Sequence, residues 1–344
     1  MIREAIAKLV KGEDLTLEEA EGAMGAIMAG EATPAQIGAF LIALRMKGET
    51  IPEIVGCARA MRRAMQRVPY EGLAVDTCGT GGDGARTFNL STAAAFVVAG
   101  AGVPVAKHGN RAVSSPSGSA DLLAALGAEL TLTPEQAARA LEHIRFAFLF
   151  APAFHPAMKH AIGPRREIGV RTVFNILGPL CNPAEVPYQV MGVFDPRMLE
   201  PLAEVLGALG SRHAIVVCGV GNVDEVTPSG PTRVAEYSNG QIRTWIFDPA
   251  DCGIPRAPLD ALRGATPEEN ARRLQALFRG QENGPLRTAI LLNAAFALRA
   301  ADQVEDLQEG LVRAEQALAG GAALAVMEEY IAYTRRLSQE RSDV

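Results

Sequence analysis

The residues best suited to chemistry lie in one glycine-rich stretch between Asp76 and Asp121. Residues 76–84 read Asp-Thr-Cys-Gly-Thr-Gly-Gly-Asp-Gly, and residues 107–111 read Lys-His-Gly-Asn-Arg. No acidic residue occurs between Asp83 and Asp121, although the whole chain has a formal net charge of −6. Glycines let backbone N–H groups approach a ligand, and a helix N-terminus adds partial positive charge. The stretch predicts a pocket for a strongly anionic group, most simply phosphate or pyrophosphate.

Part of this stretch also matches the dinucleotide-binding pattern G-x-G-x-x-G, at residues 79–84. That pattern needs an acidic residue about 20 positions further on, where it binds ribose hydroxyls. The segment 98–105 contains no carboxylate, and no Gly-Lys-Ser/Thr follows the glycines as a P-loop requires. A dinucleotide site and a P-loop are therefore disfavoured. For the glycines alone, an ordinary strand–helix turn remains the other interpretation.

Two adjacent carboxylates, Asp224 and Glu225, follow the β-like run Ala214–Cys218 in a loop that also contains glycine. Such a pair is often an ordinary surface feature. Beside a pyrophosphate pocket it gains a purpose, because Mg²⁺ usually binds one or two carboxylates together with substrate phosphates. The pair is a candidate magnesium site.

A basic segment spans residues 155–167 and includes His155, His160, Arg165 and Arg166. The histidines are five residues apart, which does not match the i, i+4 spacing of a helical zinc site. A solvated basic helix explains Arg166. Arg165 is the better binding candidate, because a guanidinium fork can hold a carboxylate with two hydrogen bonds.

The elements that position these residues begin with an all-helical region, residues 1 to about 70. Capping boxes are predicted at Thr16, Thr33 and Thr50, each followed three residues later by Glu or Gln. The helix after Pro34 carries an apolar stripe at helical spacing, formed by Ile37, Phe40, Leu41 and Leu44. The stripe could be the core of the small domain or a dimer surface.

From residue 71 onward, short β-rich runs alternate with helices, which predicts an α/β domain with a mostly parallel central sheet flanked by helices. A β-hairpin is predicted over 232–237 and 241–247, and core helices over 286–300 and 317–327. Polar loops after successive parallel strands meet at one sheet edge, where ligands of such sheets bind. The candidate strands are Ala74–Asp76, Val103–Ala106, Glu129–Leu132, Ala147–Phe150, Gln189–Val193 and Ala214–Cys218.

The composition is that of a globular protein: 344 residues, 48% apolar and 21% charged, enough for one large domain and a smaller one. No run of about 20 uncharged apolar residues occurs, so no membrane span is expected. The five cysteines are scattered without C-x-x-C spacing, which predicts a reducing, cytoplasmic setting. The mild acidity argues against nucleic acid as the main partner.

Taken together, four motifs resemble those of the anthranilate phosphoribosyltransferases of tryptophan biosynthesis, in the nucleoside phosphorylase/phosphoribosyltransferase fold family. They keep the family's order and spacing, and the resemblance runs over almost the whole chain. The motifs are Gly-Thr-Gly-Gly-Asp at 79–83, Asn-Leu-Ser-Thr at 89–92, Lys-His-Gly-Asn-Arg at 107–111 and Ser-Gly-Ser-Ala-Asp at 117–121.

The resemblance implies roles for individual residues. Anthranilate would contact Gly79, Asn110, Arg165, His155 and Met158. Metal ions would be held by Ser91, Asp224 and Glu225. Binding of 5-phosphoribosyl 1-diphosphate (PRPP) would involve Gly79, Gly82, Asp83, Thr87, Asn89, Leu90, Ser91, Thr92, Lys107, His108, Gly109, Asn110, Arg111, Ala112, Val113, Ser114, Ser115 and Ser119.

The resemblance also implies the reaction and the assembly. The 5-phosphoribosyl group of PRPP would pass to the amine of anthranilate with release of pyrophosphate, aided by two Mg²⁺ ions per active site. No residue is expected to be an essential general acid or base. A helical domain of residues 1–70, joined by helices from about 165–188, would form a homodimer, and residues 71–344 would form the PRPP-binding domain.

Two alternatives remain open at this point. A pyrimidine nucleoside phosphorylase of the same fold would need a nucleobase pocket around Arg165. A non-enzymatic nucleic-acid-binding relative would need a basic surface and would have lost the metal pair. The chain is net acidic and keeps Asp224 and Glu225, so the second alternative is the weaker one.

Overall fold

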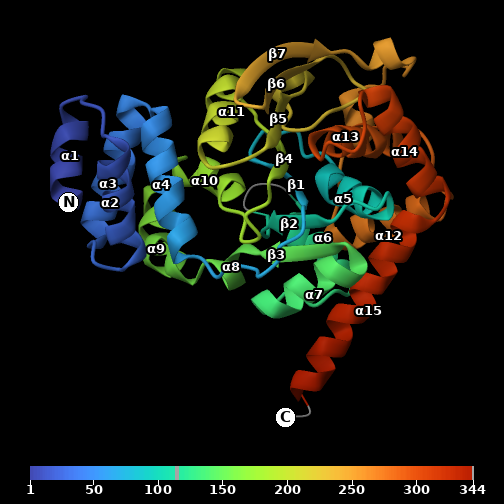
Figure 1. Ribbon diagram of the computed structural model, residues 1–344, viewed down its shortest axis with the longest axis horizontal. Coiled ribbons are helices and arrows are strands. Elements are labelled where there is room, and N and C mark those ends of the chain that lie inside the picture. Colours follow the sequence, from blue (N-terminus) through green and yellow to red (C-terminus); the bar gives the residue numbers. More distant parts are fainter. Residues whose placement is uncertain (113–115, 343–344) are drawn as a thin grey trace.

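The computed structural model describes residues 1–112 and 116–342, and it has a helical lobe beside a larger α/β lobe (Figure 1). Thr16, Thr33 and Thr133 each cap a helix, accepting from the backbone N–H three residues later. The helical lobe contains α1 (Ile2–Val10), α2 (Leu17–Met28), α3 (Pro34–Lys47) and α4 (Ile51–Ala64). Two later helices return beside it, α9 (Lys159–Ile168) against α2 and α3, and α10 (Phe174–Leu180) against α4.

The α/β lobe is built on one seven-stranded sheet with strand order β3-β2-β1-β4-β5-β6-β7. The first five of these are mutually parallel, and β6 and β7 form the predicted antiparallel hairpin at one edge. Asn239 and Gly240 both have positive φ in its two-residue turn. The strands are β1 (Val75–Gly79), β2 (Val105–Gly109), β3 (Phe146–Phe150), β4 (Tyr188–Gly192), β5 (His213–Cys218), β6 (Thr232–Ser238) and β7 (Gln241–Phe247).

Helices cover both faces of this sheet. α5 packs against β1, β2, α13 and α15, whereas α11 packs against β5 and β6 and also touches α4. The helices are α5 (Leu90–Gly100), α6 (Ser119–Leu126), α7 (Pro134–Ile144), α8 (Ala151–Phe154), α11 (Leu199–Ala208), α12 (Pro267–Phe278), α13 (Pro285–Ala300), α14 (Leu307–Ala319) and α15 (Ala322–Ser342). Short 3-10 turns lie at Pro156–Met158, Pro196–Met198, Val220–Asn222, Pro249–Cys252 and Leu259–Leu262.

Alternate strand residues face two separate cores, as the period of a strand requires. Val190 and Ile215 belong to the core under α5 and α13. Met191 and Val216 belong to a second core, which continues through α11 into the helical lobe and includes Phe40. The helical lobe therefore rests on one face of the sheet through a continuous apolar contact.

Two expectations from the sequence need correction, and one open alternative is decided by the structure. Residues 129–132 form no strand, since that segment joins α6 to α7 and lies along α15 through the hydrogen bond from the Glu129 N–H to Thr334. The alanine-rich stretch 317–327 is two helices, because Gly321, with φ 79°, breaks it. The apolar stripe of α3 is buried inside the lobe and so is core, not a dimer surface.

Within the described ranges, none of the helices combines the length and apolar character needed to cross a bilayer.

A buried charge network ties the hairpin to α13. The Glu236 carboxylate on β6 accepts hydrogen bonds from His213 Nε2 (3.0 Å), Trp245 Nε1 (3.0 Å) and Arg299 (2.9 Å). His213 Nδ1 lies 2.6 Å from Asp302. Burial alone would lower the pKa of His213, but hydrogen bonds to the two carboxylates outweigh it and raise that pKa. The network therefore favours the protonated form of His213.

This network predicts a pH-dependent stability loss in His213→Gln. A raised folded-state pKa stabilises the protein below the unfolded value near 6.5, and this contribution disappears as the pH rises through the folded value. The substitution should therefore cost about 1–3 kcal/mol at pH 6 and much less at pH 9. Urea unfolding at both pH values measures the difference. An equal cost at both pH values would mean that the imidazole is not charged in the folded protein.

Candidate active site

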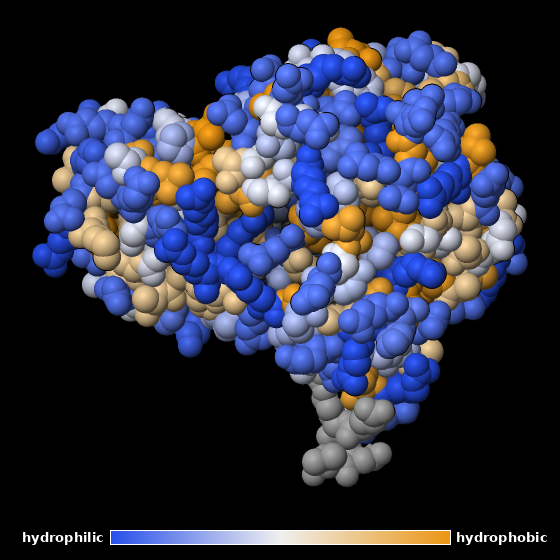
Figure 2. All heavy atoms as spheres, in the orientation of Figure 1, coloured by the Kyte–Doolittle hydropathy of each residue, from blue (hydrophilic) through white to orange (hydrophobic). Residues whose placement is uncertain are grey.

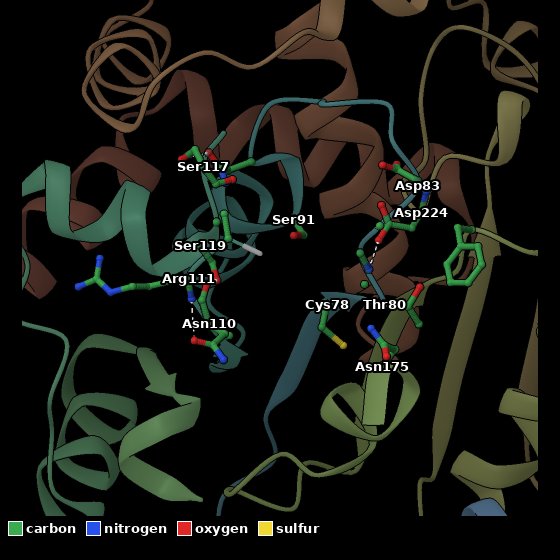
Figure 3. A pocket seen from close by; sticks show the side chains of 18 of the residues that line it. Cys78, Thr80, Asp83, Ser91, Asn110, Arg111, Ser117, Ser119, Asn175 and Asp224 are labelled. Carbon is green, nitrogen blue, oxygen red and sulfur yellow. Dashed lines mark hydrogen bonds between the residues drawn. The ribbon is translucent and has the colours of Figure 1, made fainter. Parts of the chain in front are cut away.

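A cavity of about 1000 Å³ opens at the carboxyl ends of the central parallel strands, where they face α9 and the loop after it. Figure 3 shows Asp83 and Asp224 on one side, Asn110, Arg111 and Ser119 on the other, and Ser91 between them. Figure 2 shows strongly hydrophilic side chains gathering where the two lobes meet. The sheet edge expected to bind an anion is thus the edge that carries the cavity.

The cavity brings together most of the residues singled out in the sequence. Those lining it are Gly79, Gly82, Asp83, Thr87, Asn89, Ser91, Thr92, Lys107, His108, Gly109, Asn110, Arg111, Ala112, Ser119, Arg165, Asp224 and Glu225. Leu90, His155 and Met158 are not among the lining residues, so their ligand contacts stay predictions. Val113, Ser114 and Ser115 lie outside the described residues.

Several lining residues were not singled out by the sequence. Arg171 and Asn175 come from the loop after α9 and the start of α10, and Phe194 follows β4. Arg171 could have been found as a further cation near the pocket, but no pattern marks Asn175 or Phe194. Arg86, one of the cations of the glycine-rich stretch, also lines the cavity and has φ 53°, an unusual conformation for a residue with a side chain.

The glycine loop after β1 packs directly against Asp224. The Gly81 N–H donates to Asp224 Oδ2 at 2.7 Å, and Gly81 and Gly82 both have positive φ, which suits glycine. A Cβ at Gly79 would lie 2.5 Å from Asp224 Oδ2. The glycines therefore serve close approach between the loop and the acidic pair.

The surroundings of Asp224 and Glu225 disfavour the charged forms of both carboxylates. Burial, followed by the charge of Asp83, raises the pKa of Asp224 to about 7. Burial, followed by the charge of Asp224, raises the pKa of Glu225 to about 8. A divalent cation between these oxygens would relieve both effects, and carboxylate oxygen is the ligand that Mg²⁺ prefers. The residues present therefore fit magnesium.

No group of three or more His, Cys, Asp or Glu side chains in the described part of the chain is already arranged around one point. Two of the predicted metal ligands, Ser91 and Glu225, contact each other: the Ser91 N–H donates to Glu225 Oε1 at 3.2 Å. The Ser91 hydroxyl lies 3.3 Å from Lys107 Nζ.

The position of Asp224 depends on a missing side chain at Gly192, the last residue of β4. A Cβ there would overlap the Asp224 carbonyl oxygen and lie 2.5 Å from its carbonyl carbon. Gly192→Ala should displace Asp224. It should reduce the kcat/KM of the reaction that uses this cavity by about 10²-fold, since catalysis depends on the placement of the binding groups within about 1 Å. Steady-state kinetics tests this, with Gly25→Ala in α2 as the control because its Cβ would meet nothing within 4 Å. Normal activity in Gly192→Ala would show that Asp224 need not be held there.

Lys107 is a buried cation beneath the cavity, only 2% exposed. Its Nζ donates to the Thr77 carbonyl and, at 3.3 Å, to the Ser91 hydroxyl. Burial lowers its pKa, and the charge of the fully buried Asp76 opposes that shift. Burial and Asp76 also raise the pKa of the Cys78 thiol well above its usual range, which makes Cys78 a poor nucleophile.

The loop after β2 is organised by Asp121 on α6. Its carboxylate accepts from the N–H groups of Ala112 (2.9 Å) and Gly118 (3.0 Å) and from the Arg111 guanidinium (2.9 Å). Figure 3 shows Arg111 extending away from Asp224. The charge of Arg111 is therefore partly neutralised by Asp121, the acidic residue that ends the glycine-rich stretch.

The side of the cavity formed by the later helices carries Arg165. Its guanidinium lies 4.8 Å from the centre of the Phe174 ring, and burial lowers its pKa. The rings of His108, which also lines the cavity, and His155 are 5.0 Å apart, and burial lowers their pKa values to about 3 and 4. A half-buried guanidinium over an aromatic ring suits an aromatic carboxylate.

Comparisons with known proteins agree with this geometry. Residues 71–324 match the family described as "Glycosyl transferase family, a/b domain", and residues 3–65 match its "helical bundle domain". The anthranilate phosphoribosyltransferase of Symbiobacterium thermophilum is 54% identical over 336 residues, covering 97% of this chain and 98% of the relative.

Solved structures similar to this chain also include anthranilate phosphoribosyltransferases. The crystal structure of anthranilate phosphoribosyltransferase from Thermus thermophilus is similar with a TM-score of 0.92 and 47% identity, covering 96% of this chain and 99% of that one. The Saccharomyces cerevisiae enzyme "in complex with PRPP and Mg" has a TM-score of 0.90 and 29% identity, covering 97% of this chain and 98% of that one. The chain therefore belongs to the anthranilate phosphoribosyltransferase family.

Proposed function

We propose that this protein transfers the 5-phosphoribosyl group of PRPP to the amine of anthranilate, a step of tryptophan biosynthesis that releases pyrophosphate. One observation carries the proposal: a single cavity joins a glycine loop and an acidic pair on the sheet to a half-buried arginine, Arg165, on the opposite side. The yeast relative supports it, since its structures are described in complex with PRPP and Mg and with 4-fluoroanthranilate.

In this reaction the amine nitrogen attacks C1 of the ribose as the bond from C1 to the pyrophosphate oxygen breaks. Positive charge develops on the ribose and negative charge on the leaving pyrophosphate. The Lys107 ammonium, which lines the cavity, would stabilise that negative charge. Backbone N–H groups of the glycine loop would add to this, apart from those of Thr80 and Gly81, which donate to the Gly192 carbonyl and to Asp224. Asp224, Glu225 and the Ser91 hydroxyl would hold Mg²⁺, which when bound neutralises charge on the diphosphate.

The nucleophile needs no base before attack, because an aromatic amine is already neutral at pH 7. Arg165 would bind the anthranilate carboxylate and so orient the amine toward C1. His108 and His155 have pKa values lowered by burial, so neither brings a positive charge that would oppose the developing oxocarbenium. We therefore assign the rate enhancement to positioning and to stabilisation of the leaving group.

We further propose two Mg²⁺ ions per site, a cytoplasmic location, and the domain division expected from the sequence, with the helical domain formed by residues 1–70 plus returning helices and the α/β domain by residues 71–344. All five cysteines are free, which supports a reducing compartment. The packing of α9 against α2 and α3 supports the domain division.

A homodimer through the helical lobe completes the proposal. The exposed apolar side chains Val10 and Met46 support it, being 73% and 83% exposed. Sedimentation should give twice the chain mass for the wild type and a shift toward monomer for Met46→Glu. Val312→Glu, on the exposed surface of α14, is the control and should remain dimeric. A monomeric wild type, or a Met46→Glu variant as dimeric as the control, would refute this interface.

The function is tested by product analysis. Purified protein with anthranilate, PRPP and Mg²⁺ should yield N-(5-phosphoribosyl)anthranilate and pyrophosphate in equal amounts, identified by mass spectrometry and a pyrophosphate assay. Parallel reactions contain thymidine or uridine with phosphate. Nucleoside cleavage without anthranilate consumption would instead favour the phosphorylase alternative.

A further inference from the structure

Arg171 lies between the two lobes and is explained by none of the roles above. It stands in the short loop between α9 and α10. Its guanidinium NH2 group donates to the Gly82 carbonyl oxygen of the glycine loop, and the same guanidinium lies 4.0 Å from the centre of the Phe194 ring. One side chain thus touches the loop after β1 and the segment after β4, although it comes from the returning helices.

The shape of the glycine loop is matched to this contact. Gly82 has φ 74°, and a Cβ at Gly82 would overlap the guanidinium of Arg171. On the other side of the loop, the Gly81 N–H is held by Asp224 at 2.7 Å. The loop is therefore held from the sheet by Asp224 and from the returning helices by Arg171.

The segment that carries Arg171 is itself fixed. Gly169 ends α9 in the left-handed conformation with φ 67°, and its N–H donates to the Arg165 carbonyl at 3.2 Å. The Thr172 N–H donates to Asn175 Oδ1 at 3.0 Å, which ties the loop to the first turn of α10. Since α9 packs against α3, a displacement of the helical lobe relative to the sheet moves Arg171 with it.

We propose that Arg171 is a positioning residue that fixes the diphosphate-binding conformation of the glycine loop, with Phe194 orienting its guanidinium. The proposal rests on the proposed function, because it assumes that residues 79–83 bind the diphosphate of PRPP. It links the placement of α9, and so of Arg165 at the anthranilate end of the cavity, to the placement of the loop at the PRPP end.

A charge-conserving variant separates positioning from simple attraction. A lysine ammonium can neither stack flat on Phe194 nor reproduce the planar donor geometry of a guanidinium. Arg171→Lys should therefore raise the Kd for PRPP with Mg²⁺ about as much as Arg171→Ala, by roughly 10–100-fold. Retention of near wild-type PRPP affinity in Arg171→Lys would contradict positioning and indicate direct attraction of the anion.

Phe194→Leu should raise the same Kd by a smaller factor, about 3–10-fold. The double variant Arg171→Ala/Phe194→Leu should bind PRPP no more weakly than Arg171→Ala alone, because the ring acts through the guanidinium. Additive losses would contradict that coupling. Arg197→Ala is the matched control and should leave the Kd unchanged. Like Phe194, this exposed arginine follows β4, but it pairs with Asp195 and does not line the cavity.

Calorimetric titration with PRPP and Mg²⁺ gives these constants without requiring turnover, and thermal melting verifies that each variant is folded. Steady-state kinetics should show a raised KM for PRPP with the KM for anthranilate changed less than about threefold, a split that general loss of structure would not produce. If the wild type itself binds no PRPP, the proposed function fails. If the wild type binds PRPP and both Arg171 variants bind it as tightly as the wild type, only the role of Arg171 is refuted.

Discussion

The double variant Asp224→Asn/Glu225→Gln should lose at least about 10²–10³-fold in kcat/KM for the transfer reaction. The amides keep the size of the side chains but are much weaker ligands for Mg²⁺ than carboxylates. Burial and the charge of Asp83 raise the pKa of Asp224 to about 7, and burial and the charge of Asp224 raise the pKa of Glu225 to about 8, so both sites favour a neutralising cation. Initial rates with varied Mg²⁺ measure the loss.

A second readout separates lost chemistry from lost folding. Because the substitution removes repulsion between close carboxylates, the variant without Mg²⁺ should melt at or above the temperature of the wild type. Only the wild type should gain thermal stability from Mg²⁺ plus PRPP. Glu328→Gln/Glu329→Gln, a pair of adjacent exposed acids on α15, is the control and should behave as wild type. A variant that keeps full activity and full Mg²⁺ dependence would remove this pair from the metal site.

Arg165→Ala should raise the KM for anthranilate by about 10–100-fold while changing the KM for PRPP little. The physical reason is loss of a desolvated guanidinium, which lies over the Phe174 ring and can donate two hydrogen bonds to a carboxylate. Arg165→Lys should still be impaired by about 10-fold, because the ammonium lacks the planar fork. Kinetics with varied anthranilate measures both effects.

Substrate selectivity sharpens this test. The wild type should strongly prefer anthranilate over aniline, which lacks the carboxylate, and Arg165→Ala should lose most of that preference. Lys159→Ala, an exposed cation at the start of the same helix that does not line the cavity, is the control. An unchanged preference in Arg165→Ala would show that another group binds the carboxylate.

Much of the fold followed from local sequence signals. Threonine caps marked where α2 and α3 begin, and the Asn239-Gly240 turn marked the hairpin, because both are decided by a few neighbouring residues. The strand predicted at 129–132 was wrong because its apolar residues pack against other helices without pairing to a strand. Whether the α3 stripe was core or surface depended on tertiary packing, which the local pattern does not contain.

Part of the site could likewise be predicted from the sequence, and part could not. Glycines, an acidic pair and a lone candidate arginine are visible as residue types at characteristic places, and the structure brings them to one cavity. The role of Gly192 was not visible, since it depends on the Asp224 carbonyl packing against β4. The contact between Arg171, Gly82 and Phe194 joins three distant segments, and no spacing rule connects them.

The most direct test of the central claim is the loss of anthranilate fluorescence catalysed by the purified protein in the presence of PRPP and Mg²⁺. We predict a decrease that requires all three components, stops when Mg²⁺ is chelated and is strongly reduced in Asp224→Asn/Glu225→Gln. A folded wild-type protein that leaves the fluorescence unchanged under these conditions would contradict the assignment of this cavity to phosphoribosyl transfer.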